Sequence, residues 1–229
     1  VIPFDLEFAA LEPREFLALL VDTVQPVAIF IGEGFRFGKG RAGDGATIAE
    51  FGREHRFDAV VIPRLQNGDV TISSSLVRDA LNHGNIARAT ASLGRRHRLH
   101  GTVEHGAARG RALGFPTANL LVSGDVCIPG DGIYAGYAHL SDRALGAREA
   151  MIYIGSRPTF DNGDRQVEVN ILDFSGDLYT FDLEIEFVAW IRGDRTFDSA
   201  AELSAQMHDD EASARAVLAG ADPESVTLR

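Results

Sequence analysis

The spacing of hydrophobic residues changes near the middle of the chain. Before about residue 94, apolar residues recur at helical spacing in some segments and form short continuous runs in others. After about residue 97, apolar and polar residues alternate, which is the period of strands with one buried face. The pattern therefore predicts an α/β part followed by a β part.

The first part alternates helix and strand signals. The apolar runs of the predicted strands end in glycine or proline, and serines or a glycine mark helix ends. A strand–helix–strand order indicates a parallel α/β sheet. The pattern predicts strands over 26–32 and 58–65 and helices over 13–24, 44–57, 73–84 and 85–94.

The second part contains strands separated by turn residues. Such strands, joined by hairpin-like turns, predict an antiparallel barrel or sandwich. A helix follows from about Asp198 to Leu218, with Ser199 or Asp198 as its cap. The alternation predicts strands over 132–140, 147–156, 165–174 and 179–191.

These patterns divide the chain into two predicted domains, residues 1–96 and 97–229, with the boundary near residues 94–100. The chain begins Val1-Ile2-Pro3-Phe4, a sequence typical of the inside of a domain. We therefore expect that the amino-terminal part of the natural protein precedes these residues.

Composition narrows the class of protein. The 229 residues are 45% hydrophobic and carry a formal net charge of −11, which argues against a nucleic-acid partner. The short basic cluster Arg95-Arg96-His97-Arg98 is interpreted as a solvated linker. A single cysteine, Cys127, excludes an internal disulfide and is typical of the cytoplasm. No signal peptide and no apolar run of membrane-spanning length is present, so no membrane partner is expected.

The segment 106–119 carries the strongest chemical signal. Thr117 and Asn119 lie two apart, so an extended backbone places both side chains on one face. A hydroxyl and an amide carbonyl are hard oxygen ligands that suit Mg²⁺, which takes further ligands from water and phosphates. Glycines that allow close approach, with Arg109 and Arg111 among them, favour a clamp for a magnesium–nucleotide complex. The alternative is an ordinary barrel loop in which Thr117 and Asn119 cap a turn.

A strand over 166–174 holds a candidate base. Alternation places Glu168 and Asn170 on one face and Val167, Val169 and Ile171 on the other. A carboxylate on such a strand can act as a general base if a substrate proton comes within hydrogen-bond reach. The alternative is a strand that faces solvent.

Two further patterns lie in the first part. Residues 38–43 match G-x-G-x-x-G, but six residues separate them from the end of the preceding strand, so a dinucleotide fingerprint is disfavoured. At 72–78, Ser73, Ser74 and Ser75 begin a helix, and Arg78 follows one turn later. Hydroxyls, free N–H groups and the helix dipole would together hold phosphate, whereas the alternative is a helix cap with more serines than it needs.

The second half closely resembles the riboflavin kinase domain of bacterial bifunctional FAD synthetases. The resemblance rests on motifs that occur in the order of that family, at 106–120, 132–137, 155–160, 167–179 and 191–203. It implies a six-stranded antiparallel barrel with a carboxyl-terminal helix.

The resemblance also implies roles for site residues. By position in the motifs, Thr117 and Asn119 would bind the magnesium of ATP, and Glu168 would be the catalytic base on the ribityl 5′-hydroxyl of riboflavin. Nucleotide-binding positions of the kinase would be Gly106, Arg109, Gly110, Gly114, Phe115 and Pro116.

The first half resembles the FMN adenylyltransferase domain of the same proteins, which is a nucleotidyltransferase-type α/β fold. The residues that carry this resemblance lie at 2–17, 32–44 and 72–78. Positions implied to meet ATP or flavin there are Gly32, Phe35, Ser73, Ser74, Ser75 and Arg78.

The chain departs from the family in four places. The G-x-F-D-G-x-H-x-G-H motif of the adenylyltransferase does not occur in these residues, Gly34 replaces the usual asparagine, and Asn170 replaces the usual histidine. Residues 93–101 also depart from the common Pro-Tyr linker of the family. We therefore expect a riboflavin kinase that uses ATP and Mg²⁺ to make FMN, and little formation of FAD by this chain. Two alternatives are a flavin-binding paralogue without catalysis and a nucleotidyltransferase with another acceptor.

Overall fold

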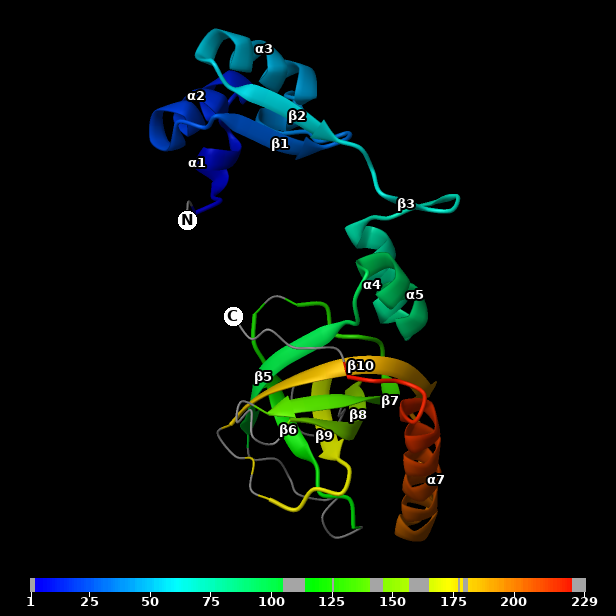
Figure 1. The fold of residues 1–229 in the computed structure, drawn as a ribbon. Helices are drawn as coiled ribbons and strands as arrows, with labels where there is room; N and C mark the ends of the chain where they lie inside the picture. Colours follow the sequence, from blue (N-terminus) through cyan, green and yellow to red (C-terminus); the bar gives the residue numbers. More distant parts are fainter. Residues whose placement is uncertain are drawn as a thin grey trace. The chain divides into compact units, whose positions relative to one another are not determined.

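The computed structural model describes residues 3–104, 114–124, 126–140, 146–156, 165–176, 178 and 181–223. Contacts between Cα atoms divide the chain into two compact units, Val1–Ile72 and Ser73–Arg229. Figure 1 shows the elements of both units. No helix in the described part of the chain has the length and apolar character needed to cross a membrane.

The first unit is built on a parallel pair of strands. β1 (Ala28–Gly32) pairs in parallel with β2 (Asp58–Ile62), and α3 (Gly45–His55) connects them. The predicted parallel α/β arrangement is therefore confirmed. The pattern did not predict α1 or the short hairpin β3–β4. The remaining elements are α1 (Leu6–Ala9), α2 (Pro13–Val24), η1 (Lys39–Arg41), β3 (Gln66–Asn67) and β4 (Val70–Thr71).

The core of this unit forms where α2 and α3 pack on the strands. Local signals fix the starts of both helices: Pro13 opens α2, and Asp44 caps α3 by accepting a hydrogen bond from the backbone N–H of Thr47. Buried apolar side chains then fill the space between helices and sheet; they are Leu17, Ile31, Phe37, Ile48, Phe51 and Phe57.

The second unit is a closed antiparallel barrel of six strands, and its described residues include the helices α4, α5 and α7. The strand order is β10-β5-β6-β9-β8-β7, so β10 closes the sheet by pairing with both β5 and β7. The predicted fold class is confirmed. The elements are α4 (Ser74–Asn82), α5 (Ile86–Leu93), β5 (Arg98–Glu104), β6 (Ala118–Val122), β7 (Gly132–Leu140), β8 (Ala147–Ser156), β9 (Arg165–Ile171), β10 (Asp182–Arg192) and α7 (Ala200–Leu218).

Alternation along each strand separates the barrel interior from its outer face. On β9, Val167, Val169 and Ile171 point inward, as the sequence predicted, and Glu168 and Asn170 therefore lie on the outer face. In the described residues the interior contains a cluster of buried hydrophobic side chains, among them Leu99, Val103, Leu120, Tyr134, Ile152, Ile154, Leu183, Ile185 and Phe187.

Helix α7 covers part of the outer face and forms a second core with it. Ser199 caps the helix, as predicted. Ion pairs fasten it: Arg192 of β10 contacts Asp210 in a bidentate manner at 2.8 and 2.7 Å, and Arg215 contacts Asp173 at 2.9 Å through both terminal nitrogens. Arg215 also lies 3.6 Å from Glu149 of β8. The apolar contacts come from Phe115, Ala135, Tyr137, Met151, Leu172, Ala214 and Leu218.

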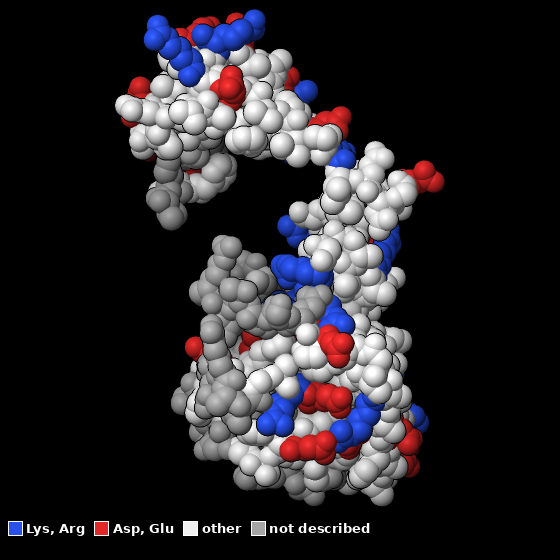
Figure 2. Space-filling view, in the orientation of Figure 1, with Lys and Arg blue, Asp and Glu red and all other residues white. Residues whose placement is uncertain are grey.

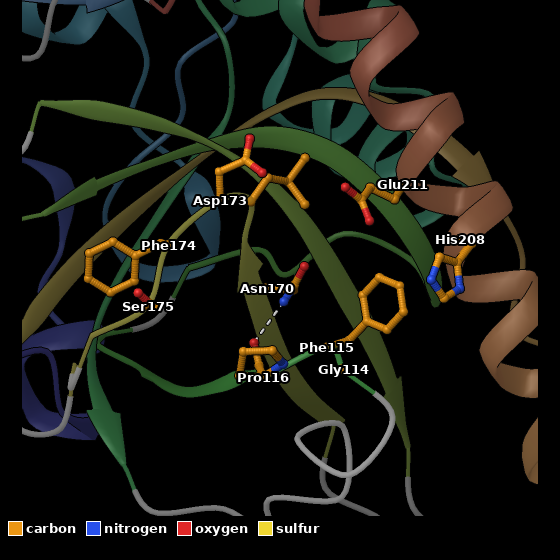
Figure 3. Close-up of a pocket in the computed structure, with 10 residues that line it drawn as sticks. Gly114, Phe115, Pro116, Asn170, Asp173, Phe174, Ser175, His208 and Glu211 are labelled. Atoms are coloured by element: carbon orange, nitrogen blue, oxygen red, sulfur yellow. Dashed lines mark hydrogen bonds between the residues drawn. The ribbon is translucent and has the colours of Figure 1, made fainter.

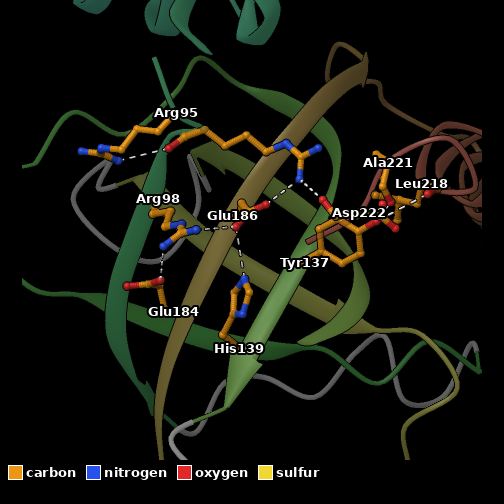
Figure 4. Close-up of polar contacts among 10 residues, drawn as sticks. Arg95, Arg98, Tyr137, His139, Glu184, Glu186, Leu218, Ala221 and Asp222 are labelled. Carbon is orange, nitrogen blue, oxygen red and sulfur yellow. Dashed lines mark hydrogen bonds and ion pairs between the residues drawn. The ribbon is translucent and has the colours of Figure 1, made fainter. Parts of the chain in front are cut away.

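The basic cluster at 95–98 is not the solvated linker that we expected. Glu186 of β10 is 0% exposed, and its two oxygens lie 2.7 Å from Arg96 and 2.9 Å from Arg98 (Figure 4). His139 of β7 lies 3.3 Å from the same carboxylate. A buried carboxylate has to be paired, because an uncompensated buried charge costs about 3–5 kcal/mol. The arginines therefore belong to the barrel, and basic and acidic side chains stand side by side on the face shown in Figure 2.

The contacts group α4 and α5 with the barrel, because α5 packs on β10. The two units are defined by contacts in space, and they need not coincide with the domains of the family. The boundary between residues 96 and 97 stays a prediction.

We predict that Gly136→Ala destabilises the barrel. An added Cβ at Gly136 would lie 2.1 Å from the backbone oxygen of Glu186, so β7 and β10 would have to separate. Overpacking of this kind costs about 2 kcal/mol, which urea unfolding followed by circular dichroism would measure. At Gly193 the nearest atom would be 3.8 Å away, so Gly193→Ala is the matched control. Equal stability of the two variants would contradict the prediction.

We predict that the Arg215–Asp173 pair stabilises the fold in a pH-dependent way. Hydrogen bonds from Arg215 lower the pKa of Asp173 below its usual 3.8. The folded state therefore favours the ionised carboxylate, and this stabilisation is present above pH 3.8 and is lost as the pH falls through the lowered pKa.

The test is the melting temperature of Asp173→Asn against the wild type as a function of pH. Asp173 has a φ of 56°, a left-handed conformation that asparagine also tolerates, so the substitution removes the charge and keeps the backbone preference. The difference in melting temperature should be largest near neutral pH and should shrink in acid. Asp209→Asn, a change at an exposed carboxylate of α7, the helix that carries Arg215, should show no such trend. A difference that is constant with pH would exclude the ion pair as its cause.

Candidate functional site

The predicted metal and catalytic residues lie together on the outer face of the barrel. Asn119 of β6 is directly opposite Glu168 of β9, and Glu168 is directly opposite Tyr153 of β8. Directly opposed residues share a face, with Cβ atoms about 5 Å apart. Thr117, just before β6, donates a hydrogen bond from Oγ1 to Oε2 of Glu168 at 3.0 Å. The structure therefore brings Thr117, Asn119 and Glu168 together, as the sequence predicted.

A cavity of about 320 Å³ adjoins this row, between the outer face of the barrel and α7. Thr117 and Glu168 lie on its wall, so a carboxylate and a hydroxyl meet any molecule that enters. Five of the remaining lining residues are apolar: Ile133, Met151, Phe197, Leu203 and Met207.

Fixed polar groups complete the lining of this first cavity. Asp210 is only 3% exposed and is held by Arg192, and it also accepts a hydrogen bond from Gln206 at 3.0 Å. The hydroxyl of Tyr153 donates to Asp194 at 3.3 Å. Burial, together with the nearby carboxylate of Asp194, raises the pKa of Tyr153 to about 12, so this phenol stays protonated at neutral pH. The cavity thus offers an apolar surface with a few oriented polar groups, as small-molecule sites do.

A second cavity, of about 460 Å³, lies on the other side of Asn170, which lines both (Figure 3). Its wall includes Gly114, Phe115 and Pro116, three of the predicted nucleotide-binding positions. Gly114 has a φ of +87°, a conformation that favours glycine. The other lining residues are Leu172, Asp173, Phe174, Ser175, His208 and Glu211.

The acidic groups of the second cavity are compensated by Arg215. This guanidinium contacts Asp173 and Glu211 together, at 2.9 and 2.7 Å. From α7, His208 meets the ring of Phe115 edge to face, with 4.9 Å between ring centroids. The helix therefore fixes both the charge balance and one wall of this cavity.

Three predicted nucleotide-binding residues, Gly106, Arg109 and Gly110, lie outside the described residues. Their role stays a prediction.

In the first unit, Gly32 and Phe35 line a smaller cavity of about 220 Å³ next to the start of α3. This is the carboxyl end of a parallel strand, where ligands bind in open α/β sheets. Gly34 lies in the same wall with a φ of +77°, and an added Cβ would approach Arg64 to 2.9 Å. Glycine favours this backbone conformation, and the atom nearest to an added Cβ is the end of the exposed Arg64 side chain, which can move aside.

The serine cluster belongs to the second unit. Ser73 caps α4 by accepting a hydrogen bond from the backbone N–H of Leu76 at 3.2 Å. Ser74, Ser75 and Arg78 are exposed. The cap supports the structural interpretation of Ser73, and the predicted contact of this cluster with phosphate stays untested.

Sequence reasoning missed Tyr153 and the Arg192–Asp210 pair. Alternation along β8 could have placed Tyr153 on the same face as Glu168. The burial of Asp210 could not be found in this way, because its helix has acidic residues on several faces and only the contact with Arg192 distinguishes one of them.

Comparisons with known proteins agree with this geometry. A model of riboflavin kinase matches residues 93–218, and a model of FAD synthetase matches residues 1–76. The bifunctional riboflavin kinase/FMN adenylyltransferase of Escherichia coli K12 is 37% identical over 217 residues, which cover 93% of this chain and 68% of that protein. The protein of the same name from Bacillus subtilis is 31% identical and is covered over 66% of its length.

A solved structure shares the fold. The crystal structure reported as a macrolide-efflux protein from Streptococcus pneumoniae has a TM-score of 0.80 and 30% identity, over 93% of this chain and 67% of that one. The resemblance inferred from the motifs is confirmed by these matches. Because the kinase model covers more than half of the chain and the chain covers more than two thirds of the Escherichia coli relative, this chain belongs to the bifunctional riboflavin kinase/FMN adenylyltransferase family.

Proposed function

We propose that this chain transfers the γ-phosphoryl group of ATP to the 5′-hydroxyl of riboflavin, forming FMN and ADP. The observation that carries the proposal is the hydrogen bond between Thr117 and Glu168, with Asn119 opposite, where two cavities adjoin. A phosphoryl transfer between two substrates needs adjoining binding sites with the catalytic groups between them, because catalysis consists mostly of positioning and charge stabilisation.

The first cavity suits riboflavin. An isoalloxazine ring is flat and largely apolar, and the walls formed by Met151, Phe197 and Met207 are apolar too. Glu168 stands in the same wall, so a flavin bound there can present its ribityl chain to the carboxylate. Arg192 and Asp210 supply fixed polar groups for the heteroatoms of the ring.

The second cavity suits the nucleotide. Gly114, Phe115 and Pro116 lie directly before Thr117, so a nucleotide in this cavity has its phosphates close to the Thr117–Asn119 pair. The larger volume and the partly polar lining fit an adenine nucleotide better than a flavin ring. We assign Gly106, Arg109 and Gly110 to the same site by their place in the motif.

In the reaction, the ribityl oxygen forms a bond to the γ-phosphorus while the bond from that phosphorus to the β–γ bridging oxygen breaks. ADP leaves, and Glu168 accepts the proton of the hydroxyl. The hydroxyl of Thr117 donates to Glu168 and so orients the carboxylate before substrate arrives.

The donor set fits Mg²⁺. Because the proton of Thr117 points to Glu168, the oxygen lone pairs of this hydroxyl remain available, and Asn119 adds an amide oxygen on the same face. Thr117 and Asn119 would hold the ion, which would neutralise phosphate charge when bound.

A second activity, the joining of AMP to FMN to give FAD, is supported by the match to FAD synthetase over residues 1–76. We expect little of it from this chain, because the H-x-G-H motif is not among its residues. Incubation with FMN, ATP and Mg²⁺, followed by chromatography for FAD, tests this. A flavin-binding paralogue without catalysis is disfavoured, because a sensor needs no base beside a pair of metal ligands.

We predict that Glu168→Gln lowers the rate of FMN formation by at least about a hundredfold. The amide keeps the size of the side chain and loses the basic oxygen, so binding of riboflavin and ATP should change little. Chromatographic measurement of FMN and fluorescence titration of riboflavin check the two parts. Glu50→Gln, the same change at an exposed position of α3, should leave the rate unchanged. Undiminished FMN formation by the Glu168 variant would refute its role as base.

We predict that Asn119→Ala weakens binding of the magnesium–ATP complex by about tenfold, or 1.4 kcal/mol. The change removes one of the two proposed ligands without adding charge. Calorimetric titration with ATP should show the loss in the presence of Mg²⁺ and little change when the ion is chelated. Asn67→Ala on the β3–β4 hairpin is the control. Equal affinity for magnesium–ATP in both variants would exclude Asn119 as a ligand.

A further inference from the structure

The pairing of β6 with β9 stops just before Thr117, one of the two proposed magnesium ligands. The register joins Ala118 to Val169 and Asn119 to Glu168. If the pairing continued by one residue toward the start of β6, Thr117 would lie opposite Asn170. The preceding residue, Pro116, has no backbone N–H, so it cannot donate to the ladder. The segment that carries Thr117 therefore has to be held by something other than sheet hydrogen bonds.

The side chain of Asn170 provides this contact. It is 7% exposed, and its Nδ2 donates to the carbonyl oxygen of Pro116 at 2.7 Å (Figure 3). Two residues earlier on the same face of β9, Glu168 accepts the hydroxyl of Thr117 at 3.0 Å. Alternate side chains of one strand thus hold two consecutive residues of the neighbouring segment.

This pair of contacts lies between the two cavities. Pro116 lines the second cavity, Thr117 lines the first, and Asn170 lines both. A shift of the Pro116–Thr117 segment would therefore change the shape of both cavities and the place of the Thr117 hydroxyl at once.

We propose that Asn170 is a positioning residue for phosphoryl transfer: its amide fixes the Pro116 carbonyl and thereby sets the Thr117 hydroxyl against Glu168. This inference rests on the proposed kinase function. Asn170 is not a base or a metal ligand in it, and it acts through the segment that it holds. Because reaction rates depend steeply on alignment, its loss affects turnover more than binding of riboflavin.

The experiment compares a substitution of Asn170 that removes the hydrogen-bond donor with one that keeps a donor. Asn170→Leu keeps a similar size and removes the N–H, and Asn170→His keeps an N–H on its ring. We expect kcat of Asn170→Leu to fall by about tenfold to a hundredfold. Its riboflavin affinity, from quenching of flavin fluorescence, should stay within about threefold of the wild type, and Asn170→His should retain most of the wild-type kcat. Asn67→Leu on the exposed hairpin is the control and should behave as the wild type.

The outcomes separate the claims. Wild-type kcat in Asn170→Leu, or equal losses in the leucine and histidine variants, would overturn the role of the amide. A loss of stability in thermal unfolding with kcat unchanged would show a merely structural contact and would also overturn it. If the leucine variant does not fold, Asn170→Asp, which keeps the shape and loses the donor, is judged by the same criteria. If the wild-type chain makes no FMN, the kinase assignment fails, and the inference falls with it.

Discussion

The packing of the barrel interior determines where the chemistry of this protein can lie. Six strands form a closed barrel, and apolar side chains of the described residues pack its interior. Residues that alternate with this core must face outward, and Glu168, Asn170 and Asn119 all do so. The same two-residue period that makes the strands bury one face therefore presents the candidate base and metal ligands on the other.

A site on the outside of a barrel needs a cover, and α7 supplies it. One helix contributes Leu203 and Met207 to the first cavity and His208 and Glu211 to the second. Its ion pairs with Arg192 and Asp173 hold it against β10 and the turn that follows β9. The two cavities therefore share α7 as a common wall and Asn170 as the residue between them. A change that moves the helix would alter the shape of both cavities.

Much of the site followed from local spacing in the sequence. Thr117 and Asn119 at positions i and i+2, and Glu168 and Asn170 likewise, needed only strand alternation to be placed on common faces. That these two strands are neighbours came from the resemblance to a family, because no local pattern fixes which strands pair. The alternation pattern did not predict strands β5 and β6. β5 begins with Arg98, a basic residue that is typical of the protein surface until its partner Glu186 is known.

The error at 95–98 shows the limit most clearly. A run of basic residues is indistinguishable in sequence from a solvated linker, and its meaning depends on Glu186, which lies 90 positions later. The burial of Asp210 beside Arg192 has the same origin. Pairs of charges that are distant in sequence and close in space cannot be found from composition or period.

Three glycines fix how the helical pair α4–α5 adjoins the barrel. Gly84, between the helices, and Gly132, at the start of β7, leave room for the ring of Trp190, since a Cβ would approach that ring to 2.9 and 2.7 Å. Gly130 lets its segment approach the backbone oxygen of Asn82, where a Cβ would come within 2.3 Å. The indole ring of Trp190 thus packs against the turn between α4 and α5. A chain shortened to start at His97 would lose α4, α5 and Gly84, and would uncover more of the Trp190 ring, which is already 46% exposed.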